Sequence, residues 1–183
     1  MNRFGTIIAA LLVASPCLAT VTMTYKAIVT NVVDGNTILI DVKRAPNTNN
    51  PVGMKPGGPV VLDAIDAPEL DQPGGQEARQ FLTELLVGKE VLVVELTDMG
   101  TSRGAWVTLD GNCVNLLLVQ NGHAWLGTFN VHGQRSRQAK LPAALAAAKE
   151  KRIGIWEPED PVAPSEWRKR DKETANKEIQ PTK

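Results

Sequence analysis

Cysteine and histidine are scarce in this chain, which excludes several kinds of site. The 183 residues include 2 Cys and 2 His, and Cys17 lies in an apolar N-terminal segment. Once that segment is removed, Cys113 remains alone and cannot form an internal disulfide. No histidine is arranged beside it in the sequence as the partner of a catalytic thiol. We therefore interpret Cys113 as a small buried apolar residue.

A surplus of basic residues is also absent. The chain has 20 Lys and Arg against 20 Asp and Glu, so its formal net charge is zero. It lacks the overall positive field expected of a dedicated nucleic-acid-binding protein, although local basic patches are compatible with this balance.

Long apolar runs are missing beyond the N-terminus. Arg3 precedes the apolar residues 7–13, and small residues stand at 17 and 19, which is the pattern of a secretory signal peptide cleaved after Ala19. The run is shorter than the roughly 20 residues that a membrane-spanning helix needs. A retained membrane anchor is the alternative. We predict an exported protein, periplasmic or secreted, with no stable membrane span after loss of residues 1–19.

The remaining sequence predicts one domain. Its hydrophobic content of 43% is enough for one packed core. Patterns typical of strands cover 25–33, 37–42, 60–65, 90–96 and 103–109, and patterns typical of helices cover 76–87, 114–120 and 142–151. Short strands joined by turns predict an α+β fold with a small antiparallel barrel. We place this domain at 20–157 and a polar, mixed-charge tail at 158–183, with order ending near Asp171.

Two segments carry a family resemblance. Residues 34–37 read D-G-N-T and residues 61–69 read V-L-D-A-I-D-A-P-E. They resemble the active-site core of the staphylococcal nuclease (thermonuclease-like) family, whose pattern is D-G-D-T, then R-L-x-x-I-D-x-P-E, then a loop similar to D-R-Y-G-R. Weaker matches follow in the same order at 75–78, 110–115, 154–156 and 165–169. The resemblance covers about 25–156. It implies a five-stranded antiparallel OB-fold barrel with three helices and a calcium-dependent nuclease acting on DNA or RNA.

The resemblance also implies roles for particular residues. Asp66 and the carbonyl of Ala67 become calcium ligands, and Glu69 becomes the general base that orients or deprotonates water. Pro68 restricts the turn between them. Hydrolysis of a phosphodiester requires such a base, together with positive groups that neutralise charge at phosphorus. The alternative is a solvated turn after a strand, which the same residues would form without the surrounding matches.

The chain departs from the family at positions that the chemistry needs. Asn36 replaces a metal-binding carboxylate, and its amide oxygen can ligate calcium but adds no negative charge, so metal affinity should be weakened. Val61 replaces the arginine that would bind phosphate, and losing one such donor typically costs about 10²–10³ in rate. Arg103 is the candidate for the family's second arginine. Counting back from the Asp-Gly pair at 110–111 places Ser102 there instead, and the spacing leaves both open.

A few further residues could lie at the site or away from it. Asp63 stands two residues after Val61, so a continuous strand would place an acid on the same face. The basic runs at 134–140 and 168–170 could contact phosphates. We favour solvated surface for both runs, and for Trp167 a packing role rather than stacking on a ligand.

We therefore predict an exported thermonuclease-like domain whose catalysis is lost or severely weakened. One alternative is an active calcium-dependent nuclease that uses Asp66, Glu69 and Arg103. Another is a periplasmic module that binds a protein partner. On the first reading calcium is bound weakly or not at all, and the partner is nucleic acid or another protein.

Overall fold

The computed structural model describes residues 21–42, 57–98, 102–127 and 135–179, with side chains left out at some of their ends. The predicted signal peptide at 1–19 lies outside the described residues. No helix in the described segments is both long enough and apolar enough to cross a membrane.

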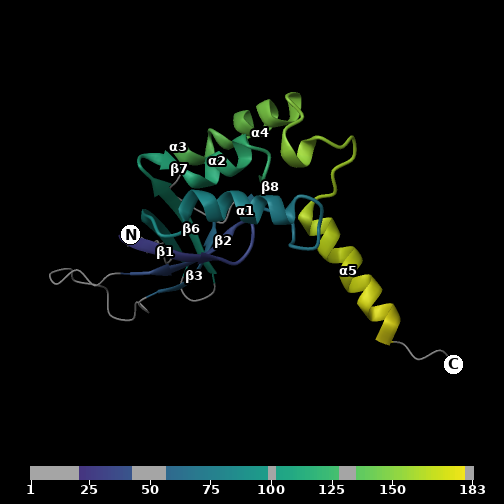
Figure 1. Cartoon of the computed structure of the whole chain (residues 1–183), viewed down its shortest axis with the longest axis horizontal. Helices are drawn as coiled ribbons and strands as arrows, with labels where there is room; N and C mark the ends of the chain where they lie inside the picture. Colours follow the sequence, from purple (N-terminus) through teal and green to yellow (C-terminus); the bar gives the residue numbers. More distant parts are fainter. Residues whose placement is uncertain (1–20, 43–56, 99–101, 128–134, 180–183) are drawn as a thin grey trace, which may run out of the picture.

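The strands form one large sheet and one small pair (Figure 1). The sheet contains β1 (Val21–Val32), β2 (Thr37–Asp41), β3 (Gly58–Leu62), β5 (Glu90–Asp98), β6 (Ser102–Leu109) and β7 (Asn112–Cys113). Their order is β3-β2-β1-β5-β6-β7, and β3 also pairs with β6. The β3–β6 pair is parallel, an exception to the antiparallel pairing that we predicted. The small pair joins β4 (Ile65–Asp66) to β8 (Trp125–Leu126).

Helices cover the sheet and then leave it. They are α1 (Gly75–Leu86), α2 (Val114–Gln120), α3 (Arg135–Gln138), α4 (Leu141–Glu150), the 3₁₀ turn η1 (Gly154–Trp156) and α5 (Pro164–Ile179). The three predicted helices correspond to α1, α2 and α4, whereas α3 and α5 were not predicted. The mostly antiparallel α+β arrangement agrees with the predicted OB-like fold. Helix α5 continues to Ile179, beyond the end that we expected near Asp171.

The core lies between the sheet and the helices. Helix α1 buries Ala78, Leu82 and Leu86, which recur every four residues and so share one face. Asn115 of α2 is fully buried and has three backbone partners: its Oδ1 accepts from the Val107 N–H at 3.1 Å, and its Nδ2 donates to the carbonyls of Asp63 and Ala105 at 2.9 and 3.0 Å. These bonds fix the turn after β3, from which the candidate site follows.

Asp63 does not lie beside Val61 as a continuous strand would require. Strand β3 ends at Leu62, and Ala64 adopts a left-handed backbone with φ 64°, so the chain turns there. Val61 is 43% exposed while Asp63 is only 7% exposed. Burial raises the pKa of the Asp63 carboxyl. The acid that we expected on the exposed face is therefore inside the protein.

Candidate active site

The turn between β1 and β2 is pressed against the loop that follows β4. Within the turn, the Asn36 N–H donates to Asp34 Oδ1 at 2.9 Å. A Cβ on Gly35 would lie 2.6 Å from the Cβ of Ala67, so only glycine fits this contact. The Asn36 side chain meets the next segment as well, because its Nδ2 lies 3.5 Å from the Ile65 carbonyl oxygen. The fold thus brings Asn36 to Ile65, the residue before Asp66, and Gly35 to Ala67.

The loop from Asp66 to Gly75 is held by its own hydrogen bonds. Asp66 opposes Trp125 in the β4–β8 pair, which fixes its backbone. Gln72 is buried and secures Glu69 twice: its Oε1 accepts from the Glu69 N–H at 3.2 Å, and its own N–H donates to the Glu69 carbonyl at 2.9 Å. A Cβ on Gly75 would overlap that same carbonyl. The Glu69 backbone is therefore held on both its N–H and its carbonyl side.

Asp66 and Glu69 share one cationic partner, Arg168 of α5. Its Nη1 donates to Asp66 Oδ1 at 3.1 Å and to Glu69 Oε1 at 2.7 Å, while its Nη2 donates to Asp66 Oδ2 at 2.9 Å. The hydrogen bonds to Asp66, and then the one to Glu69, raise the pKa of Arg168 further above its ordinary value. Sequence reasoning missed this contact because we interpreted 168–170 as solvated surface. The match at 165–169 was the available signal.

The positions of the family's two arginines are only partly described. Val61 pairs with Thr37 and with Gly104, and its exposed side chain offers no hydrogen-bond donor. Ser102 and Arg103 both lie in β6, just before Gly104. Their side chains fall outside what the structure describes, so the choice between them stays open.

The residues do not fit a calcium ion while Arg168 is docked. Calcium takes six to eight oxygen ligands. Both carboxylate oxygens of Asp66 already accept hydrogen bonds from Arg168. Among the described residues, no group of three or more His, Cys, Asp or Glu is placed to hold a metal. The carboxylate pair is a cation site whose occupant in this structure is a guanidinium.

An apolar cavity of about 460 Å³ adjoins this site through Trp125, the strand partner of Asp66, and through Trp167, the neighbour of Arg168. His123 lies on the same wall, stacked on Phe81 with ring centroids 4.4 Å apart. Burial lowers the pKa of His123. Trp167 is half-buried here; its packing role stays a prediction.

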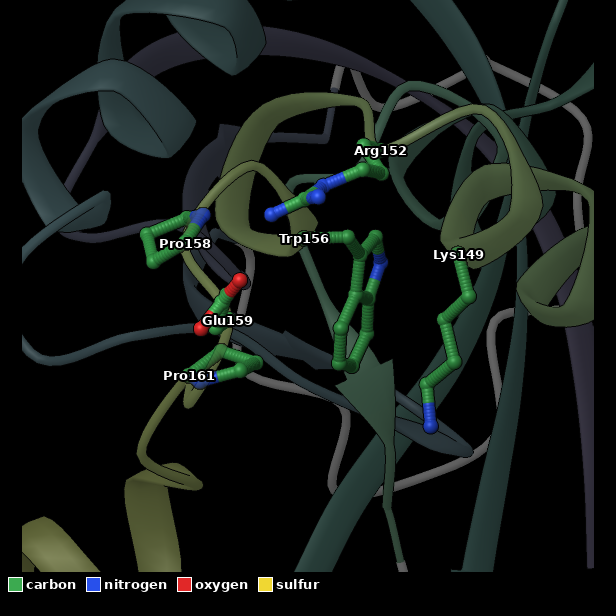
Figure 2. Close-up of a pocket in the computed structure, with 6 residues that line it drawn as sticks. All are labelled: Lys149, Arg152, Trp156, Pro158, Glu159 and Pro161. Atoms are coloured by element: carbon green, nitrogen blue, oxygen red, sulfur yellow. The ribbon is translucent and has the colours of Figure 1, made fainter.

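A second hollow, of about 380 Å³, lies between the end of α4 and the segment after η1 (Figure 2). Lys149 and Arg152 line it together with Trp156 and Glu159. The Lys149 Nζ is 4.6 Å from the Trp156 ring centroid, and Arg152 donates to the Glu157 carbonyl at 3.0 Å. Lys149 thus joins α4 to η1, and Arg152 joins the residues that follow each of these two elements. Neither Asp66 nor Glu69 lines this hollow, so it is separate from the candidate site.

Comparison with known proteins shows the family of this chain. Residues 59–158 match the model of the family described as staphylococcal nuclease homologue. This chain belongs to the staphylococcal nuclease family. Arg168 lies beyond the matched segment.

Three relatives show how far the similarity extends. Protein ParB of Escherichia coli is 32% identical over 179 residues, covering 92% of this chain and 91% of that protein. A protein of Escherichia coli O157:H7 named as an uncharacterized endonuclease is 31% identical over 145 residues, with coverage of 78% and 84%. Staphylococcal-like nuclease CAN1 of Arabidopsis thaliana is 31% identical over 111 residues, which are 60% of this chain and 33% of that protein.

Proposed function

We propose that this protein is an exported member of the staphylococcal nuclease family whose phosphodiesterase activity on DNA or RNA is severely weakened. The carrying observation is the state of the carboxylate pair. Asp66 and Glu69 stand together as in the family's motif, but both are bound by Arg168 instead of being open to a metal and water.

Glu69 is the residue that would activate water. Its backbone is held by Gln72, and 39% of its side chain is exposed, so the carboxylate can reach a bound water. A general base must accept a proton through a free oxygen within hydrogen-bond reach. Because Glu69 Oε1 accepts from Arg168 at 2.7 Å, that oxygen is engaged in this structure.

Neutralisation of charge at phosphorus is the weaker half of the site. Val61 cannot donate a hydrogen bond where the family has arginine, and this loss alone typically costs about 10²–10³ in rate. Asn36 supplies an amide where the family has a carboxylate, which lowers the negative charge available to a divalent ion. These two departures support impaired catalysis, and the retained Asp66 and Glu69 support a residual activity.

Cleavage of single- and double-stranded DNA and of RNA in calcium tests this proposal. We expect slow turnover by the wild-type protein, a gain in the Asn36→Asp, Val61→Arg double variant, and none in the same variant carrying Glu69→Gln. The comparison standard is a family member that has both missing residues. Wild-type turnover close to that standard would contradict the proposal. A double variant that remains as slow as the wild type would show that Asn36 and Val61 are not a sufficient cause of the weakened activity.

Export is part of the same proposal and is supported by the pattern in residues 1–19. Protein expressed from the full sequence in a Gram-negative host should be recovered from the periplasm or medium with Thr20 at its N-terminus, which N-terminal sequencing measures. Recovery of the chain in the membrane fraction with residues 1–19 intact would overturn this part of the proposal.

A further inference from the structure

We infer that α5 is an inhibitory latch: Arg168 occupies the cation site formed by Asp66 and Glu69, and a divalent ion can bind there only when the start of α5 moves away. The inference rests on the proposed function because it concerns the same carboxylates, but it makes a claim about metal binding that does not depend on catalysis.

The guanidinium is matched to the two carboxylates. It donates three hydrogen bonds of 2.7 to 3.1 Å, two of them to the two oxygens of Asp66. This bidentate geometry is the strongest arrangement of an arginine with a carboxylate. A divalent ion would need these same Asp66 oxygens. Arginine and metal therefore compete for one site, and each lowers the apparent affinity of the other.

The latch has further attachments that bring Arg168 to the site. Gln72, which also secures Glu69, donates from its Nε2 to the Val162 carbonyl at 2.7 Å just before α5 begins. Trp167 lines the apolar cavity beside Trp125, the strand partner of Asp66. Attachments before and at the first turn of the helix thus hold the guanidinium over the carboxylates.

The part of α5 that follows Arg168 is exposed. Figure 1 shows the helix extending away from the body of the protein. Residues 169–174 are all exposed. The Arg168 side chain is itself 43% exposed, and exposed ion pairs are modest in strength and weakened by salt. The population with Arg168 docked therefore exceeds the population with α5 released by a limited factor. We expect the latch to weaken calcium binding on the order of tenfold.

Calorimetric titration of calcium alone into the full mature protein tests the latch. Arg168→Ala should bind calcium roughly tenfold more tightly than wild type. The control Lys169→Ala removes one positive charge from the next position of the same helix and should bind as wild type does. Asp66→Ala should abolish the binding gained in Arg168→Ala. Equal or weaker calcium binding by Arg168→Ala would overturn the latch.

A second variant separates release of the helix from the mere loss of a charge. Trp167→Ala leaves Arg168, Asp66 and Glu69 unchanged but removes the attachment in the apolar cavity. We expect it to tighten calcium binding in the same direction as Arg168→Ala. If Trp167→Ala binds calcium as wild type does, the gain in Arg168→Ala is a charge effect and the latch is wrong.

Nuclease assays on the same proteins distinguish a latch from a substrate contact. Faster cleavage by Arg168→Ala supports the latch, whereas slower cleavage with unchanged calcium affinity would assign Arg168 to phosphate binding and overturn it. If no variant cleaves DNA or RNA, the proposed function fails, while the calcium titrations still decide whether Arg168 excludes the metal.

Discussion

The side chain of Gln72 should contribute more to stability than its position in a surface loop suggests. Only 4% of this residue is exposed, and its amide joins two backbone segments that are distant in sequence. Its Oε1 accepts from Glu69 at 3.2 Å, and its Nε2 donates to Val162 at 2.7 Å. Gln72→Ala removes both bonds and leaves two backbone groups without this partner, so we expect a loss of about 1–3 kcal/mol in the free energy of unfolding.

Urea denaturation measures this loss, and a matched residue provides the control. Gln76 is exposed in α1, and its Nε2 donates to the Leu70 carbonyl at 2.9 Å. Gln76→Ala should cost less than about 0.5 kcal/mol, as is usual for surface substitutions. Hydrogen exchange should rise in the first turn of α5 in Gln72→Ala but not in Gln76→Ala. Equal urea midpoints for the two variants would refute the reasoning that Gln72 couples the site to α5.

Three other substitutions test the frame of the site. Asn115→Ala removes three buried hydrogen bonds and should destabilise by about 2–4 kcal/mol in urea, against less than about 1 kcal/mol for Asn121→Ala, whose single bond to Leu117 is exposed. Gly35→Ala should lower the free energy of unfolding by about 1–3 kcal/mol, because the new Cβ would meet Ala67. An unchanged Tm in thermal unfolding would show that the turn can move to admit the methyl group. The pKa of the Asp63 carboxyl is raised in the folded protein. The protonated side chain therefore contributes fully to the free energy of unfolding below pH 3.8, the ordinary pKa of this group, and the contribution is lost as pH rises through the pKa of the folded protein. Asp63→Asn should therefore be the more stable protein at pH 7, with a gain that shrinks toward pH 3; a gain independent of pH would contradict this account.

Much of the fold could be predicted because its elements are encoded locally. The predicted helix at 76–87 matches α1 to within one residue at each end. The prediction was possible because Ala78, Leu82 and Leu86 are spaced to form one buried face. Helix α2 coincides with the predicted 114–120. Helix α5 was missed because its sequence is mostly polar, and its few apolar residues are too sparse to mark an apolar period.

The candidate site, like the fold, could be predicted only in part. The motif at 61–69 named Asp66 and Glu69, and in the structure both carboxylates bind Arg168, while the Asn36 side chain meets the carbonyl of Ile65, the residue before Asp66. Their catalytic and metal-binding roles stay predictions. Asp63 was misplaced because the alternation rule assumes an unbroken strand, whereas the left-handed Ala64 ends it.

By itself, the sequence determined the family, most of the elements of the α+β fold, and the two departures at Asn36 and Val61, because each is written in neighbouring residues or in a motif of fixed spacing. Only the tertiary structure decided what occupies the carboxylates. Arg168 is 102 residues from Asp66 in the sequence. No local periodicity relates two residues so far apart, and their contact depends on how the packed domain positions the start of a polar helix.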